Sequence, residues 1–283
     1  MAACSAREPP LRISNVPTAV DDATADTAVF LMLGALRNFN ASLFSLRQGR
    51  WRTGEAGSVP ALGHDPRGKV LGILGMGGIG RNMMRKCEAF GMRTIYHNRR
   101  PLGGELAGGA EWVEFDELLR RADVLSLNLP LNVGLLFTFV LISAIDYRGD
   151  ILFVFLLDSQ KNADRFFFFS QKNTRHIIST PEFAKMKPGV VIVNTARGAV
   201  MDEDALVHAL ESGRVLSVGL DVFEEEPKVH PGLVANPNVM LLPHMGTYSV
   251  ETMEKMEEWC LENVRRAVGE GRLMSPVPEQ VDL

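Results

Sequence analysis

The sequence predicts an α/β fold in which a doubly wound parallel sheet carries helices on both faces. Two observations lead to this prediction. Short apolar runs alternate with helical segments along most of the chain, and a glycine-rich turn joins the first apolar run to the helix that follows it. Such alternation places strands in parallel, because each helical crossover returns the chain to the same edge of the sheet.

The predicted elements follow one another in chain order. Apolar residues at spacings of three and four predict a first helix over residues 21–48, capped by Asp21 or Asp22, and a glycine- and proline-rich loop follows to residue 67. Strands are predicted at residues 70–74, 94–97, 124–129, 190–194, 216–222 and 239–242. Further helices are predicted from the glycine turn to about residue 90, at 116–121, from Thr180-Pro181-Glu182 onward, at 202–212 before Gly213, and from 249 to about 268.

Composition limits the class of protein. The 283 residues are 46% apolar and 23% charged, with a formal net charge of -4, so a buried core is expected. A net charge this mild gives no sign of the clustered basic face that nucleic-acid binding needs. Cys4, Cys87 and Cys260 are far apart and form neither a metal-ligand pair nor a disulfide framework. With no secretory signal in the first ten residues, we expect a cytoplasmic protein without a metal, nucleic-acid or membrane partner.

The glycine-rich turn Gly75-Met76-Gly77-Gly78-Ile79-Gly80 has the spacing GxGxxG. In such a turn the first glycine permits the bend, the second lets a diphosphate approach the backbone, and the third lets helix and strand pack closely. The phosphates then lie on unpaired amides at the helix N-terminus. Because the motif stands between a predicted strand and a predicted helix, it predicts a dinucleotide site on a Rossmann-type sheet. The alternative is a purely structural turn.

The end of the second predicted strand bears on the choice of dinucleotide. NAD sites usually carry an acid there for the ribose hydroxyls, whereas this segment is Tyr96-His97-Asn98-Arg99-Arg100. Guanidinium groups suit the oxygens of a 2′-phosphate, which a carboxylate would repel. We therefore expect Asn98, Arg99 and Arg100 to contact the cofactor, with NADP(H) preferred and NAD(H) possible. The alternative is that both arginines are ordinary solvated charges.

The second half of the chain carries a series of motifs that point to a family. In order, they are Met186-Lys187-Pro188-Gly189, Val193-Asn194-Thr195-Ala196-Arg197-Gly198, Asp202-Glu203-Asp204-Ala205-Leu206, Gly219-Leu220-Asp221-Val222-Phe223-Glu224-Glu225-Glu226-Pro227 and Leu242-Pro243-His244-Met245-Gly246. This series resembles the D-isomer-specific 2-hydroxyacid dehydrogenases, and among them the glyoxylate, hydroxypyruvate and 2-ketogluconate reductases. The resemblance covers residues 13–131 and 173–268. It implies reduction of a small 2-oxoacid by hydride transfer, in a homodimer formed through the nucleotide domain.

The resemblance also implies a catalytic set of Arg197, Glu226 and His244. The guanidinium would grip the substrate carboxylate and polarise its carbonyl. His244 would give a proton to the carbonyl oxygen, and Glu226 would orient the imidazole and favour its charged form. Each residue taken singly also fits an ordinary surface or loop position. The catalytic interpretation is favoured because all three follow predicted strands, at the edge where such sheets bind ligands.

The expected cofactor contacts extend beyond the glycine turn. Asp221 resembles a residue on the nicotinamide side, and Thr195 and Ala196 resemble residues that line the cofactor cleft. The full expected set is Gly75, Gly77, Gly78, Ile79, Gly80, Asn98, Arg99, Arg100, Leu129, Pro130, Thr195, Ala196, Arg197, Asp221, His244 and Gly246.

The chain departs from the family pattern before its first long helix. The family builds a separate substrate domain mostly from sequence that precedes this helix, and only 20 residues precede it here. We expect residues 1–17 to be a remnant of that domain and residues 18–248 to form the NAD(P)-binding domain. Residues 249–283 are expected to form a C-terminal helix and tail that return to the substrate domain. A non-catalytic, corepressor-like nucleotide-binding module and an inactive fragment are the alternatives to an active reductase.

Residues 133–171 fit no part of the family pattern. They contain eight of the fifteen phenylalanines and no proline, and removing them joins two segments that continue the pattern. The stretch begins with a Val, whose codons start with GT, and ends with a Gln, which CAG can encode. We hypothesise an intron retained in the translated sequence. The alternatives are a dimerisation insert and a membrane segment. The latter is disfavoured because its apolar run is too short and interrupted by charges.

Overall fold

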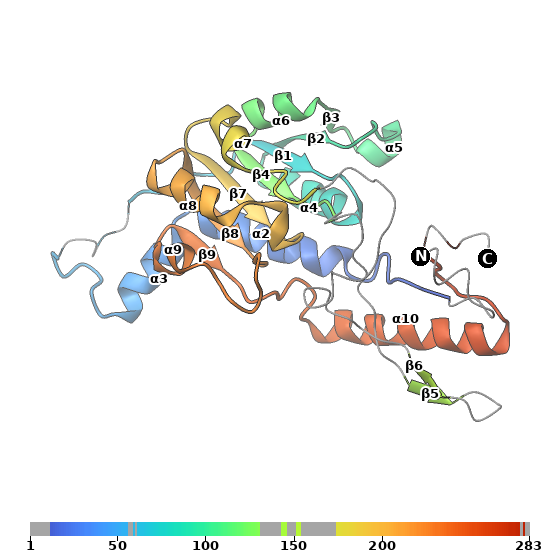
Figure 1. The fold of residues 1–283 in the computed structure, drawn as a ribbon. Coiled ribbons are helices and arrows are strands. Elements are labelled where there is room, and N and C mark those ends of the chain that lie inside the picture. Colours follow the sequence, from blue (N-terminus) through green and yellow to red (C-terminus); the bar gives the residue numbers. More distant parts are fainter. Residues whose placement is uncertain are drawn as a thin grey trace. The chain divides into compact units, whose positions relative to one another are not determined.

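The computed structural model describes residues 12–55, 59, 61–130, 143–145, 151–153, 174–277 and 280 (Figure 1). These residues fall into two compact units. The larger unit covers described residues between 21 and 130 and between 174 and 246. The smaller unit covers residues 12–20, 143–145, 151–153 and the described residues from 247 onward. The domain limits given by the sequence stay a prediction.

A seven-stranded sheet forms the centre of the larger unit (Figure 1). Its strands lie in the order β3-β2-β1-β4-β7-β8-β9, and every neighbouring pair is parallel. This order confirms the predicted doubly wound fold, with β1 and β4 as the neighbours at which the direction of winding reverses. The strands are β1 (Val70–Leu74), β2 (Arg93–His97), β3 (Glu111–Trp112), β4 (Val124–Leu127), β7 (Val190–Asn194), β8 (Val215–Leu220) and β9 (Val239–Leu241).

Helices cover both faces of this sheet, and each face has its own apolar core. One face packs against α2 (Asp21–Leu36) and α4 (Gly78–Glu88), the other against α6 (Phe115–Arg121), α7 (Thr180–Lys185) and α8 (Glu203–Glu211) (Figure 1). Burial on both sides explains why the central strands are mostly apolar and do not alternate between apolar and polar residues. Every residue of β4 and of β7 is buried.

The helix predicted over residues 21–48 is wrong as a single element, because the chain forms two helices there. α2 ends at Leu36, and α3 (Phe39–Arg47) leaves it at an angle of 74°. Between them, Asn38 has a φ of 54°, and its Nδ2 donates to the carbonyl oxygen of Ala61 at 3.0 Å. Asn is one of the few residues that tolerate the left-handed region. No single helix in the described residues is long and apolar enough to cross a bilayer; α2 and α3 pass that test only as this bent pair.

Several short elements were not predicted, and three predicted strands end early, namely β4, β8 and, by one residue, β9. The additional elements are α5 (Gly104–Ala107), β3, the 3₁₀ turn η3 (Gly198–Val200) and α9 (Pro231–Ala235). The two-residue strand β3 is too short to show alternation. β4 ends before Asn128, whose Nδ2 donates to Ser126 Oγ at 2.9 Å, and β8 ends before Asp221, whose carboxylate accepts backbone amides of a neighbouring loop. Polar side chains engaged in hydrogen bonds therefore mark the ends of β4 and β8.

The smaller unit contains α10 (Val250–Gly269), for which Ser249 is the N-cap. Residues near both ends of the chain pair here, since the Asn15 amide donates to the Ser275 carbonyl oxygen at 3.1 Å. β5 (Ser143–Ile145) and β6 (Ile151–Phe153) form an antiparallel pair. They are the described part of the anomalous stretch 133–171. The hypotheses for that stretch otherwise fall outside the described residues, as does most of the predicted remnant 1–17.

Candidate active site

The glycine turn lies between β1 and α4, at the reversal point of the sheet. Gly75 has a φ of 97°, and a Cβ there would come within 2.8 Å of the backbone carbon of Asn128. A Cβ on Gly80 would lie 2.9 Å from the Gly75 carbonyl oxygen, whereas one on Gly77 would meet nothing within 4 Å. The turn is therefore tightly packed at Gly75 and Gly80 but open at Gly77, which is the N-cap of α4. This is the arrangement that lets a diphosphate approach helix amides.

Two buried side-chain oxygens at this edge of the sheet have no hydrogen-bond partner among the residues that the structure describes. They are Asn128 Oδ1, directly after β4, and Thr195 Oγ1, directly after β7. Buried polar atoms almost always find a partner. The hydroxyl and amide groups of a dinucleotide would supply one, so the residues present fit such a cofactor. Asn128 was not predicted as a site residue, although its position beside Leu129 and Pro130 was a signal.

Asn98 connects the end of β2 to the glycine turn. Its Oδ1 accepts a hydrogen bond from the Met76 amide at 2.7 Å. Arg99 and Arg100 follow it and are exposed, with no ion pair formed to the described part of the chain. Asn98 thus positions the glycine turn, a role that was not predicted from the sequence. It also lies where a cofactor ribose is expected.

The turn after β7 presents Arg197. Asn194 is fully buried, its Oδ1 accepts from the Ala196 amide at 3.0 Å, and its Nδ2 donates to the Arg197 carbonyl oxygen at 3.1 Å. The Arg197 side chain is exposed and donates to the Ala196 carbonyl oxygen at 2.7 Å. A Cβ on Gly198 would overlap the backbone of Phe223, so this turn and the one after β8 lie in direct contact.

Asp221 is buried beneath the loop that carries His244. It is 1% exposed, and its two carboxylate oxygens accept the amides of Met245 at 2.6 Å and Gly246 at 2.8 Å. The His244 amide donates to the Asp221 carbonyl oxygen at 2.8 Å. Burial raises the pKa of Asp221, and the two amides counter that effect. Both oxygens are therefore engaged in orienting the loop, a role that was not predicted alongside the expected cofactor contact.

His244 and Glu226 form a hydrogen-bonded pair. His244 Nδ1 lies 2.8 Å from Glu226 Oε2, and Glu226 Oε1 accepts the Phe223 amide at 2.9 Å. The hydrogen bond to Glu226 raises the pKa of His244, against the effects of burial and of Arg197. Burial would raise the pKa of Glu226, but His244, the Phe223 amide and Arg197 outweigh it and lower that pKa. The pair therefore favours imidazolium beside carboxylate.

The structure brings the three predicted catalytic residues together at one edge of the sheet. Arg197, Glu226 and His244 follow β7, β8 and β9 respectively, and the Arg197 charge acts on both other side chains. Within the described residues His244 Nε2 has no hydrogen-bond partner. A charged proton donor thus stands beside a guanidinium that can bind an anion, which is chemistry suited to protonating a carbonyl oxygen. The individual roles remain predictions.

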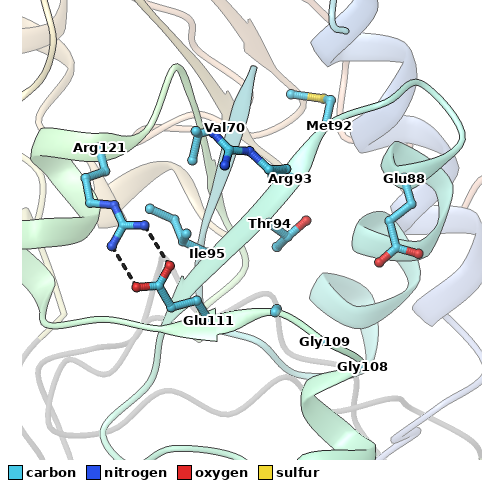
Figure 2. A pocket seen from close by; sticks show the side chains of 11 residues that line it. Val70, Glu88, Met92, Arg93, Thr94, Ile95, Gly108, Gly109, Glu111 and Arg121 are labelled. Atoms are coloured by element: carbon cyan, nitrogen blue, oxygen red, sulfur yellow. Dashed lines mark hydrogen bonds and ion pairs between the residues drawn. The ribbon is translucent and has the colours of Figure 1, made fainter. Parts of the chain in front are cut away.

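A pocket of about 350 Å³ lies at the opposite edge of the sheet (Figure 2). Its lining includes Val70 and Arg93, the first residues of β1 and β2, and the Glu111 carboxylate that binds Arg121 at 2.6 and 2.8 Å. None of the predicted site residues lines it. The pocket is thus separate from the candidate active site.

Comparisons with known proteins identify a family and several relatives of this chain. The family described as D-isomer specific 2-hydroxyacid dehydrogenase, NAD binding domain, matches residues 29–134 and 166–246. A 4-methyl-2-oxopentanoate reductase A of Aspergillus oryzae is 50% identical over 95% of this chain and 69% of its own length. Glyoxylate reductase 1 of Saccharomyces cerevisiae is 43% identical over 95% of this chain and 66% of its own length. The crystal structure of a glyoxylate reductase from Paecilomyes thermophila matches with a TM-score of 0.79 and 50% identity, over 96% of this chain and 70% of that one.

Replacing Glu226 tests the pairing without any assumption about activity. We expect Glu226→Gln to lower the pKa of His244, because the hydrogen bond to the carboxylate is the main cause of its upward shift. An NMR titration of the His244 ring protons measures this. Since the folded-state pKa is raised, the pair contributes stability that is complete below the unfolded pKa and is lost as pH rises through the folded one.

Glu225→Gln is the matched control, because Glu225 binds Lys228 at 3.0 Å and not the imidazole. It should leave the His244 titration unchanged. A His244 pKa that does not move in Glu226→Gln would contradict the pairing.

Proposed function

The chain belongs to the D-isomer-specific 2-hydroxyacid dehydrogenase family, and we propose that it reduces a small 2-oxoacid of the glyoxylate or hydroxypyruvate type to the D-2-hydroxyacid, with NADPH as the preferred coenzyme. The observation that carries this proposal is the pair of His244 and Glu226, which stands beside Arg197 at the sheet edge that also holds the glycine turn.

The proposed reaction divides its work among these three residues. The coenzyme, when bound at the glycine turn, supplies a hydride to the carbonyl carbon of the oxoacid. Arg197 holds the substrate carboxylate and draws electron density toward the carbonyl oxygen. His244 donates the proton of Nε2 to that oxygen, so the product is an alcohol and the imidazole becomes neutral. Glu226 keeps Nδ1 protonated and orients the ring throughout.

The proton transfer gives a direct test in His244→Asn. We expect reduction of the oxoacid to slow by roughly 10²- to 10⁴-fold in kcat, because the general acid is lost. NADPH binding should persist, since the glycine turn is unchanged. The assay is coenzyme oxidation with glyoxylate, hydroxypyruvate and 4-methyl-2-oxopentanoate. In the wild-type protein, the rate of reduction should fall as pH rises through the raised pKa of His244.

His208→Asn is the control for this substitution, because the side chain of His208 is 81% exposed on α8. It should retain the wild-type rate. A wild-type protein that binds NADPH but reduces none of the three oxoacids would leave the non-catalytic nucleotide-binding module as the better interpretation. An undiminished kcat in His244→Asn would remove the proposed role of His244.

The proposed preference for NADPH rests on charge at the end of β2. Arg99 and Arg100 are exposed there, and Asn98 stands where many NAD sites have an acid. We expect Arg99→Asp to lower the ratio of NADPH to NADH efficiency by about tenfold or more, because attraction to the 2′-phosphate becomes repulsion. Steady-state kinetics with both coenzymes measures the ratio.

Asn98→Asp sharpens this test, because an aspartate oxygen can still accept the Met76 amide and so preserve the turn. It should shift the ratio in the same direction. Arg85→Asp makes the same charge change on the exposed surface of α4 and should leave the ratio unchanged. An unaltered ratio in Arg99→Asp would argue for solvated arginines without a role in coenzyme choice.

We also propose that the protein is a homodimer that uses α3. Phe39, Leu43, Phe44 and Leu46 on this helix are 42–54% exposed. Monomers rarely expose so many neighbouring apolar side chains, and a second copy would cover them symmetrically. We expect Phe44→Glu to convert a dimer into a monomer, measured by light scattering after size exclusion. Phe90→Glu, at a phenylalanine 38% exposed after α4, should leave the mass unchanged. A wild-type monomer, or a dimer that survives Phe44→Glu, would contradict the assignment.

A further inference from the structure

Asp21 places a carboxylate against the start of α4. Asp21 is the first residue of α2, and Gly78 is the first residue of α4, directly after the N-cap Gly77. Any side chain built on Gly78 would overlap this carboxylate, with Oδ1 2.8 Å from the added Cβ. Glycine at position 78 is therefore needed for the packing of α2 beside α4, and not only for the approach of the phosphates.

The surroundings of this carboxylate differ from those of its neighbours. Asp21 is partly buried and has no hydrogen bond or ion pair with the described residues. Burial raises its pKa, and the charge of Arg81, one turn along α4, partly opposes that effect. Asp22 and Asp26, by contrast, are largely exposed and bind Lys86 at 2.9 and 2.5 Å. These are the charged groups that the two packed helices place near Asp21.

The carboxylate of Asp21 lies where it can affect the binding of an anion at the N-terminus of α4. A helix N-terminus attracts negative charge through its free amides and its dipole. In the free protein, Asp21 is the anion beside that terminus. A dinucleotide would bring phosphate charge to the same amides, and like charges repel more strongly where water is partly excluded.

We propose that Asp21 opposes the diphosphate of the coenzyme at the N-terminus of α4, so that binding is accompanied by protonation of its carboxylate and the affinity for the coenzyme is held down. This inference rests on nucleotide binding at the glycine turn. The diphosphate favours the neutral carboxyl, so a proton enters from solvent as the coenzyme binds. Coenzyme affinity then falls as pH rises and Asp21 ionises in the free protein. The expected benefit is faster release of the oxidised coenzyme.

Asp21→Asn tests this with a change of charge at nearly constant shape. We expect it to bind NADPH and NADH about tenfold more tightly at pH 7.5, as removal of one nearby like charge predicts. Isothermal titration calorimetry in two buffers of different ionisation enthalpy also gives the number of protons taken up. That number should be smaller in Asp21→Asn than in the wild-type protein. Comparing the two proteins removes the contribution of the 2′-phosphate, which titrates equally in both.

Asp22→Asn is the matched control, because it makes the same change one residue away on an exposed side chain. Its affinities and proton uptake should stay near those of the wild-type protein. Thermal unfolding without coenzyme provides a second readout. Asp21→Asn should unfold at the same or a higher temperature at pH 7.5, since it removes an ionised carboxylate that burial disfavours.

Three results would overturn the inference. Weaker binding by Asp21→Asn would make the carboxylate a partner for coenzyme hydroxyls, and unchanged binding would give it no role toward the coenzyme. In both cases nucleotide binding by the wild-type protein, and with it the proposed function, would stand. Failure of the wild-type protein to bind either coenzyme would overturn the proposed function together with this inference.

Discussion

The geometry of the candidate site depends on one buried carboxylate. Asp221 ends β8 and accepts the amides of Met245 and Gly246, so it joins the loop after β9 to the end of the neighbouring strand. His244 belongs to that loop and has a φ of 55°, a conformation that is unfavourable for most residues. Two hydrogen bonds to a charged acceptor supply part of the stabilisation that this conformation needs. Together with the bond from the His244 amide to the Asp221 carbonyl oxygen, they hold the loop that places the imidazole beside Glu226.

The same edge is assembled by very close backbone packing. Gly198 lets the turn after β7 touch the turn after β8, and Gly75 lets the glycine turn touch the end of β4. Asn194 and Asn98 then use their side-chain amides to hold the turns that follow β7 and β1. Residues far apart in the chain converge because parallel strands all end at one edge, and small or amide-bearing residues let the loops approach there.

The charged and polar groups at this edge suit anionic ligands. Arg197 and the imidazolium of His244 suit a small carboxylate, and the amides of α4 suit a diphosphate. Two carboxylates modify these preferences in opposite ways. Glu226 maintains the charge of His244, whereas Asp21 stands against the helix terminus that the diphosphate would occupy. In this proposal Arg197, His244 and the amides of α4 attract the ligands, and Asp21 lowers the affinity for the coenzyme.

The sequence by itself determined the fold class, the family, the glycine turn and the three residues that converge after β7, β8 and β9. These follow from local patterns: apolar runs, a GxGxxG turn and ordered motifs. It did not determine the break at Asn38, because the apolar spacing runs on through that residue and the left-handed conformation depends on a bond to Ala61. Nor did it show that Asp221 orients the His244 loop, or that the Asp21 carboxylate packs against Gly78. Both are contacts between segments distant in the chain, and only the packing of the elements around the sheet brings such segments together. The burial of the Asn128 and Thr195 oxygens, which have no partner among the described residues, likewise follows from that packing.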